Sequence, residues 1–163
     1  MKQETKTDYF NDLLLDKAVI IHPGEGERLQ AGAGSCTFKI TSEHSNNQLG
    51  IYELVIPPQT IGARLHYHQF MDETFIVNKG ILTVQLRGKE INLAAGSVIY
   101  LPRFTAHGFS NTSDTEVKVT LIFNPSEKRE GFFQGLFEIL NEPAIDAAKF
   151  LKLNHKYDSF LVE

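Results

Sequence analysis

The strongest constraint on the fold is a series of short, strand-like segments that tight turns separate. Apolar and β-branched residues dominate these segments, and the linkers at 78–80, 87–89 and 111–115 carry the Gly, Asn, Asp and Lys residues that are typical of turns. Many short strands at such close spacing favour an all-β sandwich or barrel. The predicted strands span residues 17–22, 36–42, 49–56, 73–78, 81–86, 90–93, 98–101, 106–111 and 116–123.

The pattern changes after Pro125, where helices are expected. Ser126 is predicted to cap a first helix, and Pro143 to lie in the first turn of a second. The first helix carries apolar residues at helical spacing, which we expect to pack on the barrel or on a neighbouring subunit. These residues are Phe132, Phe133, Leu136, Phe137 and Leu140.

A chain of 163 residues suits one domain. We therefore predict one domain over 1–163, with the barrel at about 17–124 and the C-terminal helices at about 127–153. Residues 1–16 are interpreted as a polar arm with a short apolar stretch at 13–15 that packs on the barrel or on a partner subunit.

Composition excludes several classes of partner. The formal net charge is -4 and the pI is about 5.9, and the sequence has no basic run and no helix-turn-helix pattern, so binding to nucleic acid is not expected. No apolar run is long enough to span a bilayer, and no membrane partner is expected. The lone Cys36 and the polar N-terminal region, which lacks the apolar core of a signal peptide, favour a cytoplasmic location.

Four side chains are candidate metal ligands. His66 and His68 are two residues apart, so in a strand both imidazoles face the same side. Glu73 begins the next predicted strand, and His107 lies on a later strand that pairing could bring opposite. Imidazoles combined with a carboxylate suit Fe, Mn, Ni, Zn or Cu and suit Ca or Mg poorly. No thiolate accompanies them, which disfavours a structural zinc knuckle.

Residues 60–111 resemble the two signature motifs of the cupin superfamily. The resemblance implies an all-β double-stranded β-helix, or jelly-roll barrel, with a C-terminal pair of short α-helices. It also implies one divalent transition metal ion, bound by the four candidate ligands. The first motif is matched by His66, His68, Glu73 and Gly80, and the second by Gly96, Pro102, His107 and Asn111.

The sequence departs from the motifs at two positions. Thr60 replaces the leading glycine of the first motif, with Gly62 displaced by two residues. Phe104 stands where the second motif often has glycine, a residue that serves positive φ angles in turns. We therefore expect a differently shaped turn there, or an aromatic ring at the mouth of the pocket. The strand-then-helix tail is similar to that of small quercetin dioxygenase-like cupins, and the family resemblance implies a homodimer.

Strand parity also predicts a substrate pocket. Arg64 precedes His66 by two residues and is expected to face the interior, either as a clamp for a substrate anion or as a salt bridge at the rim. The same parity, together with the aromatic ring expected at the mouth, gives an apolar pocket, which favours a small hydrophobic ligand. The predicted pocket residues are Arg64, Tyr52, Leu54, Phe75, Val77, Phe104 and Phe109.

Three functions remain open at the level of the sequence, because the cupin barrel hosts many chemistries. The first is a metal-dependent dioxygenase that acts on a small, largely apolar molecule, with Glu73 as the catalytic base. The second is a metal-dependent isomerase, epimerase or lyase of a small anionic substrate. The third is a module that binds a small ligand without catalysis.

Overall fold

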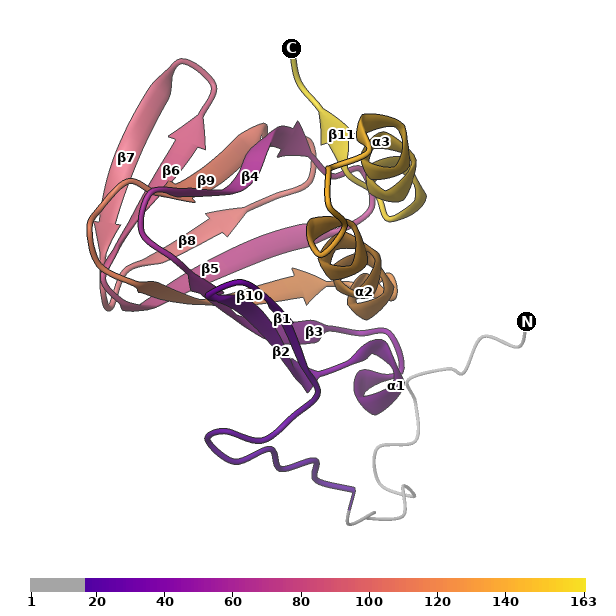
Figure 1. Ribbon diagram of the computed structural model, residues 1–163. Coiled ribbons are helices and arrows are strands. Elements are labelled where there is room, and N and C mark those ends of the chain that lie inside the picture. The colour runs from indigo at the N-terminus through magenta and orange to yellow at the C-terminus, as the bar shows by residue number, and fades with distance from the viewer. Residues whose placement is uncertain (1–16) are drawn as a thin grey trace.

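The computed structural model describes residues 17–163, and the arm predicted at 1–16 lies outside this range. Two antiparallel sheets face each other (Figure 1). The larger sheet has the strand order β1 (Arg28–Ala31), β2 (Gly34–Ile40), β3 (Gly50–Ile56), β10 (Val117–Asn124), β5 (Asp72–Lys79) and β8 (Val98–Leu101). The smaller sheet has the order β11 (Phe160–Leu161), β4 (Thr60–Tyr67), β9 (His107–Asn111), β6 (Ile81–Leu86) and β7 (Lys89–Ala94).

The core lies between the two sheets because the central strands alternate inward apolar residues with outward polar ones. On β10, Val117, Val119, Leu121 and Phe123 are buried, and the residues between them are more exposed. Strand β3 follows the same period of two and pairs with β10 in regular antiparallel register. This alternation is the one expected for a sheet that covers a core with one face. The all-β jelly-roll prediction is confirmed.

Three helices accompany the sheets within residues 17–163. Helix α1 (Ser42–Ser45) is a single turn beside the start of β3, and Thr41 caps it by accepting a hydrogen bond from the backbone N–H of His44. Helices α2 (Arg129–Leu140) and α3 (Ala147–Lys156) lie across one end of the two sheets (Figure 1). The apolar face of α2 joins the core, as the helical spacing predicted. Its buried residues there are Phe132, Phe133 and Phe137.

Three local predictions are wrong. Residues 17–22 form no strand, and Lys39 holds this segment by donating to the carbonyl of His22. Ser126 does not cap α2; its buried hydroxyl accepts a hydrogen bond from Ser42 instead, with 2.8 Å between the oxygens. Pro143 precedes α3, whose cap is Asp146, because the carboxylate of that residue accepts hydrogen bonds from two backbone N–H groups of the first turn.

No helix within residues 17–163 has both the length and the apolar character needed to cross a membrane.

Candidate metal centre

The four predicted ligands meet between the two sheets. His66 lies near the end of β4, His68 directly follows that strand, Glu73 lies on β5 and His107 opens β9. His66 and His107 are register partners across the β4–β9 pair, which brings two ligands distant in sequence side by side. One donor atom from each residue lies within 4.8 Å of all the others, and no side chain of the four is more than 6% exposed. The convergence predicted from the spacing is confirmed.

Backbone carbonyl groups orient all three imidazole rings. Nδ1 of His66 lies 2.7 Å from the carbonyl oxygen of Arg64, and Nδ1 of His107 lies 2.8 Å from that of Thr105. Nδ1 of His68 contacts the carbonyl oxygen of Asp158. A carbonyl oxygen only accepts hydrogen bonds, so each Nδ1 carries a proton, and in the neutral ring Nε2 then presents a lone pair. This is the arrangement that metal-binding histidines adopt.

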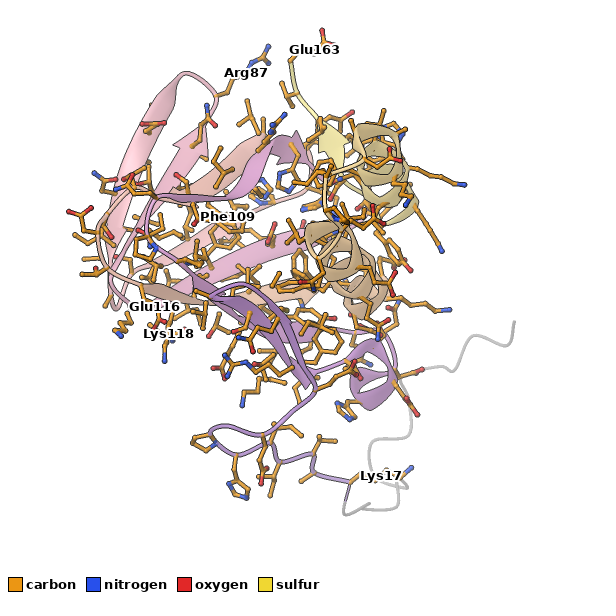
Figure 2. All side chains as sticks on the ribbon, viewed as in Figure 1. Lys17, Arg87, Phe109, Glu116, Lys118 and Glu163 are labelled. Carbon is orange, nitrogen blue, oxygen red and sulfur yellow. The ribbon has the colours of Figure 1, made fainter. Side chains whose placement is uncertain are left out.

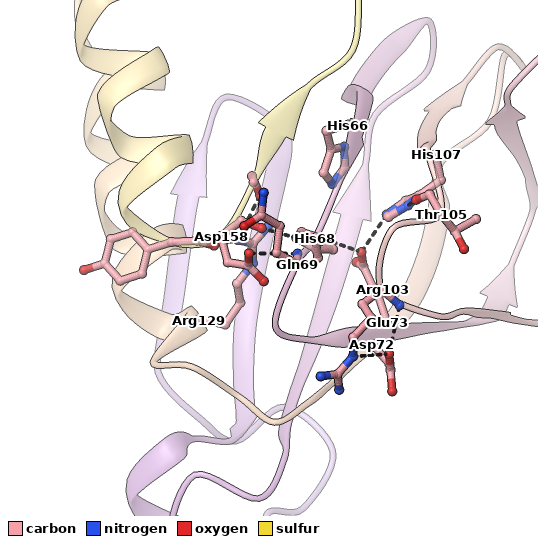
Figure 3. A network of polar contacts seen from close by, with 12 residues as sticks. His66, His68, Gln69, Asp72, Glu73, Arg103, Thr105, His107, Arg129 and Asp158 are labelled. Carbon is pink, nitrogen blue, oxygen red and sulfur yellow. Dashed lines mark hydrogen bonds and ion pairs between the residues drawn. The ribbon is translucent and has the colours of Figure 1, made fainter.

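Glu73 completes a donor set that fits a cation. Its Oε2 atom lies 3.1 Å from Nε2 of His68 and 2.8 Å from Nε2 of His107 (Figure 3). If Nδ1 carries the ring proton, these contacts place nitrogen lone pairs against a buried carboxylate. A cation bound between them replaces this repulsion with attraction, because it attracts both the nitrogen lone pairs and the carboxylate charge. Metal binding requires these same forms of the ligands, the neutral imidazole and the ionised carboxylate. The set of three nitrogens and one oxygen suits a divalent transition metal ion.

The buried environment sets the charges of the ligands. Burial lowers the pKa of His66 to about 3, and positive charge on His107 and His68 adds to this effect, so the ring is neutral at neutral pH. In the metal-free protein, burial alone would raise the pKa of Glu73, but His107 and His68 in their doubly protonated forms donate hydrogen bonds to the carboxylate, and these outweigh burial and hold this pKa below its usual range. For His107, burial acts to lower the pKa, and the contact with Glu73 reverses the shift to a raised value.

The C-terminal segment supports the loop that carries His68. The carboxylate of Asp158 accepts hydrogen bonds from the backbone N–H groups of Gln69 and Phe70, both at 2.8 Å (Figure 3). Strand β11 then pairs with β4 opposite Tyr67 and His66. No sequence pattern marks Asp158, because it lies 90 residues from His68 and outside both motifs.

A cavity of about 410 Å³ leads from the metal ligands to the C-terminal helices. His66 and Glu73 line it together with the apolar face of α2. Phe109 lies on its wall between the two sheets (Figure 2). Arg129, a buried cation at the start of α2, also lies in this wall and was not among the predicted site residues. A largely apolar cavity with a few polar groups is typical of a small-molecule site.

The predicted pocket residues are divided between this cavity and other places. Leu54, Arg64 and Phe109 line the cavity. Tyr52, Phe75 and Val77 are buried but do not line it. The hydroxyl of Tyr52 donates to the Glu130 carboxylate at 2.7 Å, and the Phe75 ring lies edge-on to His107, with centroids 5.9 Å apart. Phe75 therefore packs behind a metal ligand rather than against a substrate.

Arg64 and Phe104 differ from the expectations in instructive ways. The β4–β9 register shifts between Ala63 and His66, so the period of two is broken and Arg64 is exposed at the rim. Phe104 does adopt the left-handed backbone, with φ 65°, contrary to the expected change of turn shape. Its N–H donates to the carbonyl of His68 at 2.7 Å, while its exposed ring stacks on Tyr67 outside the cavity.

Comparisons with known proteins agree with this description. Residues 52–123 match the family described as "Cupin domain". Quercetin 2,3-dioxygenase of Bacillus subtilis (strain 168) is 28% identical over 126 residues, which are 76% of this chain and 35% of that protein. This chain thus spans about a third of the length of that relative.

Two solved structures share the fold. A predicted oxalate decarboxylase from Thermotoga maritima has a TM-score of 0.59 and 19% identity, over 66% of this chain and 99% of that one. A cupin superfamily sugar phosphate isomerase from Silicibacter pomeroyi DSS-3 has a TM-score of 0.58 and 17% identity, over 67% and 77%. Residues 52–123 thus form a cupin domain, in which the two facing sheets enclose the buried cluster of histidines and glutamate.

Proposed function

We propose that this protein is a metal-dependent dioxygenase that acts on a small, largely apolar aromatic molecule. The observation that carries the proposal is the cavity, whose aromatic wall on α2 leads directly to His66 and Glu73. The likeness to quercetin 2,3-dioxygenase supports the same reaction class. Burial of an aromatic ring against phenylalanine side chains supplies the binding energy.

In this proposal, His66, His68 and His107 hold a divalent metal ion through Nε2, and Glu73 holds it through a carboxylate oxygen. When bound, the ion supplies Lewis-acid polarisation of the substrate and activation of dioxygen. The protein fixes the rings through the three Nδ1 contacts, so that little reorganisation is needed.

Glu73 also serves as the base. The carboxylate is ionised at neutral pH and lines the cavity, where a substrate hydroxyl can reach it. Because a lowered pKa makes Glu73 a weak base by itself, the pKa of that hydroxyl would also have to be lowered by the bound ion. The proton of that hydroxyl moves to a carboxylate oxygen of Glu73. The apolar wall excludes water from the reacting atoms, which protects the deprotonated substrate.

Oxygen uptake tests the proposal. The protein is loaded separately with Fe, Mn, Ni or Cu and supplied with the flavonol quercetin, with catechols and with catechol carboxylic acids, and an oxygen electrode records consumption. We expect uptake with at least one of these ions and none with Zn, which has no redox chemistry. Glu73→Gln with matched metal content should slow turnover. Absence of uptake with every ion and every compound contradicts the dioxygenase assignment.

A second candidate is a metal-dependent isomerase or lyase of a small anionic molecule. The buried Arg129 in the cavity wall favours it, because a cation there attracts an anionic substrate. Dependence on oxygen separates the two candidates. If the metal-loaded protein still converts its substrate under anaerobic conditions, the isomerase or lyase is supported. If conversion of the substrate stops without oxygen, the dioxygenase is supported.

A further inference from the structure

Arg129 is a buried positive charge in the wall of the cavity that also contains His66 and Glu73. It is the first residue of α2 and is only 4% exposed. Aromatic rings surround its guanidinium carbon, which lies 3.7 Å from the ring centroid of Phe132 and 4.8 Å from that of Phe123. Arg129 therefore has an environment quite unlike that of the exposed Arg64.

The hydrogen bonds of Arg129 leave part of its guanidinium without a partner. Nη1 donates to the carbonyl of Tyr157 at 2.9 Å and to the hydroxyl of Ser159 at 3.2 Å. Nε is buried and has no hydrogen-bond partner in the described part of the chain. No carboxylate among residues 17–163 forms an ion pair with this guanidinium. A buried cation with neutral partners alone is costly.

Two further features show that the positive charge of Arg129 lies in an unfavourable environment. Arg129 lies in the first turn of α2, where the helix dipole is already positive. Burial lowers the pKa of Arg129 to about 10, although the more distant charge of Glu73 opposes that shift. The contacts with the phenylalanine rings offset only a part of the free-energy cost of burying this charge, since a cation–π contact is weaker than an ion pair with a hydrogen-bonded carboxylate.

We propose that Arg129 binds a carboxylate group of the aromatic ligand that occupies this cavity. The inference rests on the proposed function in taking the cavity as the substrate site. The planar guanidinium suits a carboxylate, because two of its N–H groups can point to the two oxygens. The ligand is therefore an aromatic acid whose ring packs on the phenylalanines of α2 and whose acid group neutralises Arg129.

The experiment compares two probes of nearly equal shape, naphthalene-2-carboxylate and the neutral naphthalene-2-carboxamide. Titration calorimetry with the zinc-loaded protein measures both affinities without turnover, so that the result is independent of the oxygen-uptake test. The variants are Arg129→Gln, Arg129→Lys and, as the matched control, Arg87→Gln, which changes an exposed arginine that does not line the cavity. Zinc content is determined for each variant, because Arg129 also holds the segment next to Asp158.

We expect the wild-type protein to bind the carboxylate at least about 10-fold more tightly than the carboxamide, since hydrogen bonds to charged groups are the strong ones. Arg129→Gln should reduce this preference to about 2-fold, Arg129→Lys should retain a part of it and Arg87→Gln should retain it fully. Equal affinity of the two probes for the wild type overturns the proposal. A preference that survives in Arg129→Gln with full zinc content also overturns it, because the zinc ion then accounts for the binding.

A measurement on the wild type covers the case in which Arg129→Gln does not fold. The NMR signal of the Arg129 Nε–H group is followed while each probe is added. The carboxylate should shift this signal downfield and slow its exchange with solvent, and the carboxamide should not. No selective change of this signal contradicts the proposal.

Discussion

Two of the three histidine ligands are oriented by carbonyl groups close to them in sequence, and the third is oriented by a carbonyl group near the C-terminus. The carbonyl groups that orient His66 and His107 each belong to a residue two positions earlier. The carbonyl group that orients His68 belongs to Asp158, 90 residues later. The first kind of support forms together with the strand, whereas the second requires β11 and the preceding turn to dock on the barrel. The metal centre therefore depends on a segment outside the cupin motifs.

The largest expected effect is the loss of Zn²⁺ affinity when a ligand is removed, and it should be the same whether the ligand is supported locally or by the C-terminal segment. Replacing either His66 or His68 with Ala removes a ligand atom, and we expect affinity for Zn²⁺ to fall by more than about 100-fold, beyond the range of outer-shell changes. Competition with a fluorescent chelator measures the affinity. His155→Ala, a change in α3 well outside the ligand cluster, is the control and should bind Zn²⁺ normally. Unequal losses at His66 and His68 would show that the two positions do not contribute alike.

The next effect tests the distant support alone. Asp158→Ala removes the acceptor of the Gln69 and Phe70 N–H groups. We expect Zn²⁺ affinity to fall by about 10- to 100-fold, as is typical when a group that orients a metal ligand is lost. Asp158→Asn should fall in between, because it keeps one acceptor oxygen. Circular dichroism checks that the sheets remain. Unchanged affinity in a folded Asp158→Ala protein would mean that local contacts suffice.

A smaller effect separates the two locally supported rings. In the metal-free protein, His66 should stay neutral down to about pH 4, because its pKa is lowered to about 3. His107, whose pKa the Glu73 contact raises, should gain its proton above the usual histidine range as pH falls. Protons therefore compete with the metal chiefly at His107, and metal affinity should fall as pH falls. Nitrogen-15 NMR of the imidazoles follows both titrations, and the opposite order would contradict the assignment.

The smallest effect concerns a surface contact near the centre. Arg103 pairs with Asp72 at 3.2 Å, and the Arg103 side chain is 44% exposed. Arg103→Ala should leave Zn²⁺ affinity and the melting temperature nearly unchanged, because exposed ion pairs contribute little. The backbone N–H of residue 103 still donates to Asp72 in this variant. A clear loss of metal binding would show that the side chain itself orders the loop before His107.

The sequence was informative where short-range rules apply. Strand parity and the resemblance to the cupin motifs identified the four candidate metal ligands, and turn residues located most strands to within one or two residues, as at 81–86 and 98–101. Arg64 lines the cavity as predicted, but a bulge between Ala63 and His66 breaks the period of two, so its side chain is exposed at the rim and not buried inside. The expectation at Phe104 failed because a hydrogen bond to His68 stabilises a backbone that phenylalanine disfavours by itself.

Arg129 and Asp158 could not be predicted, since their roles arise from contacts between segments that are remote in sequence. Arg129 looked like an ordinary polar residue in the first turn of a helix. Its burial follows from the docking of α2 on the open end of the sheets, which helical spacing predicts only in outline. The homodimer and the cytoplasmic location stay predictions.

The separation of 90 residues between His68 and Asp158 has a consequence for biosynthesis. A ribosome makes the signature motifs long before it makes the residue that fixes the ring of His68. A nascent chain that ends before position 158 has all four donor side chains but only two of the three carbonyl groups that align the rings. Tight capture of the ion is thus a late event, which follows the emergence of the last strand.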